Sequence, residues 1–498
     1  MFFVSYFYTN IKQMNKVAVI GSGIGGLATS IRLALKNYDV SVFEANSYLG
    51  GKLSSFEKDG FTFDTGPSLF TAPENIEALF SLAQKDITSY FTYRDLDESC
   101  RYFFANGKKI IAQKNVETFA EEAEKVFGEP SGNIKKYLQN SKKAYQNIGE
   151  LFLDFPLDLN LITKSETYKA LFSVKFPYIS KSLNSYNESS FKTPEMVQLF
   201  NRFATYNGSN PYKAPAMLSM ISSLEQSQGT FYPNGGMISI TNALVQLAKD
   251  VGVKFHIDSK VEKIETLQDI VTGVLVNGKN YKAHTVVSNM DIYYTYKNLL
   301  SDKNFADKVL KQERSSSAFI FYWGINTTFS DLGLHNIFFS EDYKKEFKQI
   351  FDESILPDEP TIYVNITSKY DKNHAPDKSE NWFVMVNAPA HNEHNWEEQK
   401  EKVRKFIIKQ INKQLKTNLE NHIVLEDTLS PLNIQQKTAS FMGSLYGTSS
   451  NSKMAAFFRQ QNKSKRYKNL YFCGGSVHPG GGIPLCFKSA KLVADDIQ

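Results

Sequence analysis

The chain has 498 residues but only three cysteines, no long apolar run and no strong excess of either charge. The cysteines (Cys100, Cys473 and Cys486) have neither the pairing of a disulfide framework nor the spacing of a metal site, so we expect no metal and a cytoplasmic protein. No apolar run approaches the ~20 residues that a membrane-spanning helix needs. A net charge of +5 over this length is too small to indicate a nucleic-acid partner.

The length of the chain exceeds what one compact core usually holds, so we expect two or more domains. Residues 1–13 are apolar and aromatic at first, but they lack the basic leader and the small-residue cleavage site of a signal peptide. A strand pattern begins directly after Met14. We therefore expect residues 1–13 to be an upstream extension, with Met14 as the working start.

The clearest local pattern lies in residues 16–44. Residues 16–20 form an apolar, β-branched run typical of a buried strand, residues 27–35 predict a helix, and residues 40–43 predict a second strand. The turn between the first strand and the helix has the form G-x-G-x-x-G. Its members that we expect to bind a cofactor are Gly21, Ser22, Gly23, Gly25 and Gly26.

Glycine is needed at each of the three motif positions for a different physical reason. Gly21 allows the tight turn, Gly23 lets a pyrophosphate approach the backbone, and Gly26 lets the helix pack closely on the strand. The free N–H groups at the start of the helix favour the negative charge of a pyrophosphate. Glu44, followed by Ala45, lies where an acid can accept the ribose hydroxyls. The unit predicts dinucleotide binding but leaves NAD and FAD open.

Two further turns that follow closely favour FAD over NAD. Gly51 and Lys52 would turn the backbone and a cation toward the cofactor, and a second turn follows the next strand pattern. A nicotinamide dehydrogenase has no need of these turns, whereas FAD extends past the pyrophosphate to a ribityl chain and an isoalloxazine ring. We expect the second turn to contact FAD through Gly66, Pro67, Ser68 and Leu69.

The C-terminal stretch is the second strong pattern. A short strand, Leu470–Phe472, precedes a glycine-rich loop and then a helix over residues 483–497, with Pro484 in its first turn. The start of this helix would face the flavin ring, where its dipole and amides stabilise negative charge. We expect contacts with FAD from Gly474, Gly475, Gly482, Ile483 and Pro484. His478, in the same loop, is a candidate catalytic residue or a structural hydrogen-bond donor.

The middle of the chain returns once to the nucleotide domain. A strand pattern over residues 253–264 contains Val261, and a later one ends in Asn289, and we place both residues at the cofactor. We expect the FAD-binding domain to consist of residues 14–80, 228–300 and 434–498. Residues 81–227 and 301–433 would form the substrate domain. Within it, residues 157–191 mix aromatic side chains with lysines, which fits either an irregular helical lid or a segment at a membrane interface.

With these motifs in place, the chain resembles the bacterial phytoene desaturase family of FAD-dependent carotenoid desaturases, within the amine-oxidase-like flavoproteins. The combination of motifs spans almost the whole chain. It departs from the family in two places, since the family often has arginine where Lys52 stands and glycine where Leu485 follows Pro484. The other matching stretches are Pro233-Asn-Gly-Gly-Met237, Val287-Ser-Asn-Met-Asp291 and residues 478–484.

The resemblance implies an α/β fold: a Rossmann-like FAD-binding domain of the amine-oxidase and phytoene-desaturase type, assembled from discontinuous segments, beside a mixed α+β substrate domain with a helical, membrane-facing region. It also implies a carotenoid substrate, peripheral contact with the inner face of the cytoplasmic membrane, and a quinone or oxygen as electron acceptor. In this light we favour membrane contact for residues 157–191.

Within the family, the chain looks most like the branch that introduces a 3,4 double bond into 1-hydroxycarotenoids. Phytoene desaturation to lycopene is the alternative. A carotenoid isomerase, an FAD-dependent amine oxidase and a flavin-bound escort-like chaperone are further ones. The chemistry implied is loss of a hydride from an allylic carbon and of a neighbouring proton. His478, Glu225 and Asp154 are the polar residues of note for the proton, and nothing in the sequence places the last two in a substrate tunnel.

The opening motif yields a direct prediction. Replacing Gly23 by valine fills the space that the pyrophosphate needs beside the backbone, so the purified Gly23→Val protein is expected to be colourless. The measurement is the flavin absorbance per mole of protein. A variant as yellow as the wild type would contradict the assignment of this turn.

Overall fold

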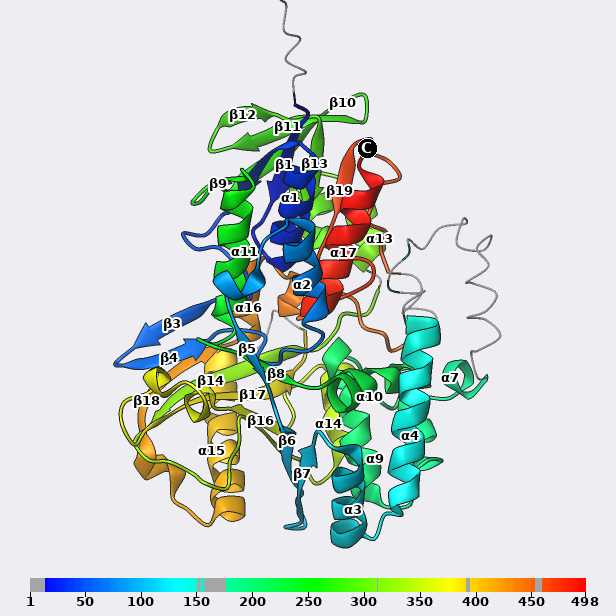
Figure 1. The fold of residues 1–498 in the computed structure, drawn as a ribbon, viewed down its shortest axis with the longest axis vertical. Coiled ribbons are helices and arrows are strands. Elements are labelled where there is room, and N and C mark those ends of the chain that lie inside the picture. The colour runs from blue at the N-terminus through cyan, green and yellow to red at the C-terminus, as the bar shows by residue number, and fades with distance from the viewer. Residues whose placement is uncertain are drawn as a thin grey trace, which may run out of the picture.

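The computed structural model describes residues 14–149, 153, 155, 176–310, 312–390, 395–452 and 459–498. Figure 1 shows two main parts. A parallel sheet with its helices lies in the upper part of the view, and a larger sheet with a group of helices lies below it. The first and last segments of the chain both contribute to the upper part.

The parallel sheet combines strands from three distant parts of the sequence. Its order is β19-β13-β1-β2-β9, and every pairing in it is parallel. Such sheets are covered on both faces and are therefore rich in Val and Ile. The strands are β1 (Lys16–Ile20), β2 (Asp39–Phe43), β9 (Lys254–His256), β13 (Thr285–Ser288) and β19 (Leu470–Phe472).

Alternate side chains of this sheet pack on different layers. Val17 and Val19 of β1 face a layer of helices, while Ala18 and Ile20 face a small antiparallel sheet and the segment after β13. The helices are α1 (Ile24–Leu35), α2 (Glu74–Leu82), α11 (Ile238–Asp250) and α17 (Ile483–Asp496). The small sheet consists of β10 (Val261–Leu267), β11 (Ile270–Val276) and β12 (Lys279–Lys282), and the segment after β13 begins with α12 (Ile292–Tyr294).

The lower part is built on a seven-stranded sheet with the order β18-β14-β17-β16-β15-β6-β7. Its pairings are antiparallel except for that between β15 and β6. The strands are β6 (Glu98–Phe103), β7 (Lys109–Gln113), β14 (Ser317–Ile325), β15 (His335–Phe338), β16 (Ile362–Asn365), β17 (Glu380–Ala388) and β18 (Ile423–Leu429).

The two faces of this sheet have different roles. Phe319, Phe321 and Trp323 of β14 pack on α15 (Trp396–Leu415), which covers one face. Ala318, Ile320 and Tyr322, at the alternate positions, point to the other face, where they meet Phe61 and Phe63 of β4 (Phe61–Asp64). This second face is turned toward the parallel sheet and the cofactor motifs.

A group of helices flanks the sheet on the side of β6 and β7 (Figure 1). An aromatic core that includes Phe119, Tyr137, Phe200 and Phe347 joins several of them to β6. The remaining elements of this part and its surroundings are α3 (Val116–Phe127), α4 (Ser131–Ala144), α7 (Phe176–Ser180), α8 (Leu183–Glu188), α9 (Pro194–Asn201), α10 (Ile221–Ser223), α13 (Lys303–Leu310), α14 (Tyr343–Phe351), α16 (Pro431–Thr438), β3 (Ser55–Lys58), β5 (Tyr93–Asp95) and β8 (Phe231–Pro233).

The predicted fold class is confirmed: a Rossmann-like sheet is assembled from separated segments, beside a mixed α+β part. The single strand expected over residues 253–264 was wrong. The chain turns at Asp258, whose φ is +48°, and forms β9 and β10 in two different sheets. The domain limits stay predictions.

The region expected at a membrane is described only in part, because residues 156–175 lie outside the described ranges. Among the residues that are described, no helix has both the length and the apolar character needed to cross a membrane.

Candidate active site

A large cavity, of about 1470 Å³, is lined by residues of both parts. Ordinary small-ligand pockets measure about 300–1,000 Å³, so there is room for more than one small molecule. One side of the cavity is formed by loops at the carboxyl ends of the parallel strands, which is where open α/β sheets bind ligands. The other side is formed by the seven-stranded sheet. Of the predicted cofactor residues, all except Gly26 line this cavity.

Asn289 joins the three segments that form the cofactor side. It directly follows β13, its N–H donates to Ile20 O at the end of β1 (2.8 Å), and its Nδ2 donates to Cys473 O after β19 (3.1 Å). A Cβ on Gly23 would lie 2.7 Å from Asn289 Oδ1, and one on Gly25 would lie 2.8 Å from Asn289 Nδ2. Glycine is therefore required at both positions for the turn, the Asn289 side chain and the C-terminal loop to meet.

Gly26 does not line the cavity, but it allows α1 to pack closely on the turn that precedes it. A Cβ there would collide with Gly21 O, so the close packing predicted for this residue is what the structure shows. Gly21 itself has φ +89°, and its N–H donates to Phe43 O of β2. The turn is thereby held between the first two strands, with the start of α1 facing the cavity.

Glu44, at the end of β2, is held in place on the cavity wall. Its Oε2 accepts from Ser22 N (2.9 Å) and Ser22 Oγ (2.6 Å), and its Oε1 accepts from Asn46 N and Asn46 Nδ2 (both 2.9 Å). The two backbone donors orient the carboxylate, and ribose hydroxyls can take the places of the two side-chain donors. Ala45 and Val261 line the cavity beside it.

The two turns that favoured FAD over NAD touch each other. A Cβ on Gly66 would collide with Lys52 O, so Gly66 lies directly against the turn of Gly51 and Lys52. The Lys52 ammonium donates to Leu445 O (3.0 Å). Burial lowers the pKa of Lys52, and the nearby Asp291 opposes that shift. A cation thus lies in the wall of the cavity.

Asp64 fixes where the second of these turns begins. Its carboxylate accepts from Met237 N (2.9 Å) and Ile238 N (3.2 Å) at the start of α11. Burial raises the pKa of Asp64 to about 6. The sequence motif around Met237 therefore positions the loop of residues 66–69 rather than lining the cavity itself.

The C-terminal loop brings the start of α17 to the cavity. Gly482 has φ +109° directly before the helix, and Pro484 lies in its first turn, as predicted. Gly474, Gly475, Gly482, Ile483 and Pro484 all line the cavity. The first amides of α17, which lack partners within the helix, supply positive potential there.

His478 is placed differently from the cofactor residues of the same loop. It does not line the cavity, and its Nε2 lies 3.0 Å from Phe155 O. Burial lowers the pKa of His478 to about 4. The structure thus gives no support to a catalytic role, because the ring contacts Phe155 O rather than the cavity.

The opposite wall of the cavity is the inner face of the large sheet. Paired positions on adjacent strands form two rows across it. Ile320, Met385, Tyr363 and Ile337 are paired in one row, and Tyr322, Phe383, Asn365 and His335 in the next. Of these eight residues, all except Asn365 line the cavity. This wall suits a long apolar molecule. It is largely apolar because alternate side chains of each strand point to the same face of the sheet.

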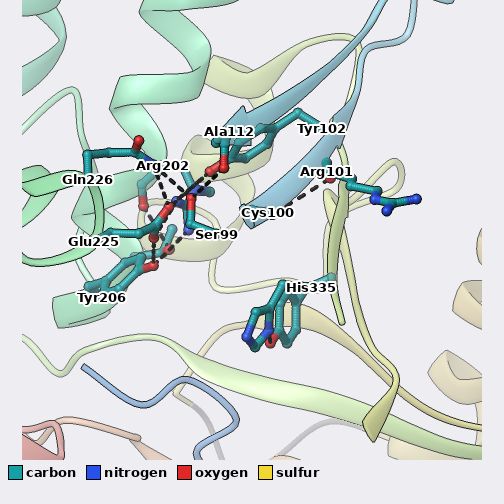
Figure 2. A network of polar contacts seen from close by, with 12 residues as sticks. Ser99, Cys100, Arg101, Tyr102, Ala112, Arg202, Tyr206, Glu225, Gln226 and His335 are labelled. Carbon is teal, nitrogen blue, oxygen red and sulfur yellow. Dashed lines mark hydrogen bonds and ion pairs between the residues drawn. The ribbon is translucent and has the colours of Figure 1, made fainter. Parts of the chain in front are cut away.

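Sequence reasoning left Glu225 unplaced, and the structure puts it at the cavity wall. Its carboxylate accepts from Arg202 Nη2 (2.9 Å to each oxygen), from Gln226 Nε2 and from the hydroxyls of Tyr102 and Tyr206 (Figure 2). Burial alone would lower the pKa of Arg202, but the Glu225 carboxylate raises it well above its usual value. Asp154 lies outside the described residues.

These features fit FAD. An oriented acid, a glycine turn at a helix start, a buried cation and a second helix start occur in the order that an adenosine, a pyrophosphate and a flavin ring require. Within the described ranges, no group of three or more His, Cys, Asp or Glu side chains is arranged to hold a metal.

Comparison with known proteins agrees with this geometry. Residues 24–498 match the model of a family described as flavin containing amine oxidoreductase. The chain is 47% identical, over 97% of its length and 99% of the relative, to the 1-hydroxycarotenoid 3,4-desaturase of Flavobacterium sp.. It is 34% identical, over 97% and 98%, to 4,4'-diaponeurosporene oxygenase of Staphylococcus aureus.

The fold is also similar to that of an oxidoreductase from Methanosarcina mazei, with a TM-score of 0.65. The two chains are 14% identical, and the match covers 97% of this chain and 100% of the other. At this identity the likeness concerns the fold alone.

The role of Asn289 can be tested by substitution. Replacing it by alanine removes the donor to Cys473 O and leaves a gap between the glycine segments, so the Asn289→Ala protein is expected to bind FAD at least tenfold more weakly. The measurement is a fluorescence titration of the apoprotein with FAD. Asn242→Ala, at an exposed position on α11, is the matched control. Equal FAD affinity of both variants would contradict the role given to Asn289.

Proposed function

The chain belongs to the flavin-containing amine oxidoreductase family, and we infer on that basis that it is an FAD-dependent carotenoid desaturase, acting at the 3,4 bond of a 1-hydroxycarotenoid. The observation that carries this proposal is the near full-length identity of 47% to a protein with that activity. The predicted resemblance to carotenoid desaturases is thereby confirmed, as are the predicted oxidoreductase class and the cofactor. The particular substrate is part of this proposal.

The substrate of such a reaction is a long apolar polyene, and the cavity suits it. The rows from Ile320 to Ile337 and from Tyr322 to His335 provide a wall against which a polyene can lie extended. Burial of the chain against this wall supplies binding energy and excludes water from the reacting carbons. The loops of Gly51, Lys52 and residues 66–69 hold the other side, so the reacting bond lies between them and the sheet.

FAD, when bound, supplies the acceptor for the hydride that leaves the substrate. The protein's own residues supply positive electrostatic potential at the flavin end of the cavity. Lys52 provides a buried cation and the first amides of α17 provide a helix dipole. Both are fixed before the reaction, because Lys52 is bonded to Leu445 O and α17 begins at a glycine with a positive φ. No reorganisation is then needed as negative charge develops.

The activity can be measured on purified, FAD-loaded protein under anaerobic conditions with a quinone. With a 1-hydroxycarotenoid we expect a product two hydrogens lighter, with a longer chromophore and red-shifted absorption. An isomerase would leave the mass unchanged, and peroxide formation from simple amines in air would indicate an amine oxidase. Conversion of phytoene to lycopene, with no reaction of the hydroxylated substrate, would contradict 3,4-desaturation but not the family.

We also propose that the protein works on the cytoplasmic face of the membrane, with a quinone or oxygen as electron acceptor. The support is chemical: the substrate dissolves in lipid, and residues 157–191 combine aromatic side chains with Lys164, Lys169, Lys175 and Lys181. Aromatic rings at the acyl boundary and lysines at anionic headgroups favour such contact.

Sedimentation with vesicles tests the membrane proposal. The wild type is expected to sediment with anionic vesicles at low salt and to be released by high salt. Replacing the four lysines of residues 157–191 by serine should abolish most of the binding. The matched control changes the same charge on α15, by replacing Lys402, Lys405, Lys409 and Lys413. Equal loss in both variants would mean that net charge, not this segment, determines binding.

A further inference from the structure

A buried polar side chain, His335, interrupts the apolar wall of the cavity at a defined place. His335 opens β15, and its ring lines the cavity together with Ile337, two residues further along the strand. His335 as a whole residue is 4% exposed. In its row across the sheet it follows Tyr322, Phe383 and Asn365. A polyene that lies along this row would end its apolar contacts at His335.

The hydrogen bonds of the ring decide which nitrogen carries the proton. Asn365 Nδ2 lies 3.2 Å from His335 Nδ1 and also donates to Leu334 O (3.1 Å), which fixes the orientation of the amide. Because an amide nitrogen can only donate, His335 Nδ1 is the accepting nitrogen. Burial lowers the pKa of His335 to about 4, so the ring is neutral at physiological pH and carries its hydrogen on Nε2.

His335 Nε2 is buried and has no hydrogen-bond partner among the described residues. A buried donor without a partner costs about 1–3 kcal/mol, and native proteins rarely leave one in place without a reason. The opposite nitrogen is fully occupied by Asn365 and by the Tyr363 hydroxyl at 2.8 Å. The free N–H is therefore held in a set orientation by its neighbours.

The nearby ion pair is a less suitable donor. Arg202 Nε is also buried without a hydrogen-bond partner, but it belongs to a guanidinium that the Glu225 carboxylate already holds. In Figure 2, His335 lies apart from the dashed contacts that join Arg202, Glu225 and Tyr206. Both oxygens of Glu225 accept several hydrogen bonds within that cluster, and three aromatic rings surround the Arg202 guanidinium. The cluster stabilises the wall, whereas the Nε2 donor of His335 stands outside it.

His335 is also close to the cofactor side of the cavity. Ser68 Oγ lies 2.8 Å from the Tyr363 hydroxyl, which lies 2.8 Å from His335 Nδ1. Two hydrogen bonds thus connect the ring to the loop of residues 66–69, which lies against Lys52. A polar group of the substrate that is bound by His335 would therefore lie only a few atoms from the reacting bond.

We propose that His335 binds the tertiary hydroxyl of the substrate through Nε2–H and so sets which bond lies at the reaction centre. This inference rests on the proposed function. In a 1-hydroxycarotenoid, C2 alone separates the carbon that bears the hydroxyl from the 3,4 bond. Apolar contacts along a polyene allow it to slide, because each position presents similar surface. A single hydrogen bond at the hydroxyl removes that freedom and rejects chain ends that lack the group.

The test uses two substrates with the same polyene, one with and one without the C1 hydroxyl, and compares kcat/KM and the dissociation constant for each. The wild type is expected to prefer the hydroxylated substrate. In His335→Leu the preference should fall about tenfold, through the hydroxylated substrate alone. His335→Gln, which keeps a donor, should recover part of the preference. His422→Gln, a histidine outside the cavity, is the matched control.

The outcomes separate this inference from the proposed function. Equal losses on both substrates in His335→Leu, or an unchanged preference, would overturn the role of His335 while 3,4-desaturation stands. A wild type that oxidises the substrate without the hydroxyl as well as the hydroxylated one would overturn both. FAD content and thermal unfolding of each variant establish that the fold is intact, and the non-hydroxylated substrate reports on the reaction centre in the same preparation.

Discussion

The close packing of glycine segments around the Asn289 side chain is the constraint on which the cofactor side of the cavity depends. Three pieces of chain, separated by some hundreds of residues, meet where β1, β13 and β19 end. Asn289 fills the space between them and bonds to Cys473 O, while Gly23, Gly25 and Gly474 leave no room for a Cβ. A side chain at any of these glycines would force the segments apart. The oriented Glu44, the Lys52 cation and the start of α17 all depend on this junction for their relative positions.

The two sides of the cavity divide the work by their chemistry. Loops with free amides, an acid and a cation form the cofactor side, where the ligand is charged and its atoms need individual partners. The sheet forms the substrate side, where a long hydrocarbon needs area rather than partners. Polar groups on that wall are consequently informative. Glu225 and Arg202 bond to each other, whereas His335 Nε2 has no hydrogen-bond partner among the described residues and can recognise a polar group on the substrate.

Much of the cofactor side could be predicted because it consists of short local patterns. The spacing of Gly21, Gly23 and Gly26, the acid at Glu44 and the glycine-rich loop before α17 each have a physical reason within a few residues of sequence. The predicted cofactor residues other than Gly26 accordingly line one cavity, and Gly26 has the packing role expected of it.

The substrate side could not be predicted in this way. His335 stands in a strand of four residues, His-Asn-Ile-Phe, with no local pattern, and its role depends on pairing with β16 and on contacts through Tyr363 to Ser68. Glu225 pairs with Arg202, which lies 23 residues earlier in the sequence, so no local pattern connects the two. Two strands form where one was expected, because the backbone of Asp258 adopts a left-handed conformation and ends the first strand despite the apolar pattern. Tertiary register, which no short window of sequence contains, determines these positions.

If the protein is a carotenoid desaturase, one cavity brings an oxidisable polyene against the bound flavin. Rapid anaerobic mixing of FAD-loaded protein with a 1-hydroxycarotenoid, in the absence of any acceptor, tests it most directly. We expect the flavin absorbance to decrease at the same rate as the red-shifted carotenoid appears, with one equivalent of product per flavin. Product formation without bleaching, or no reaction of protein that is shown to bind both ligands, would contradict it.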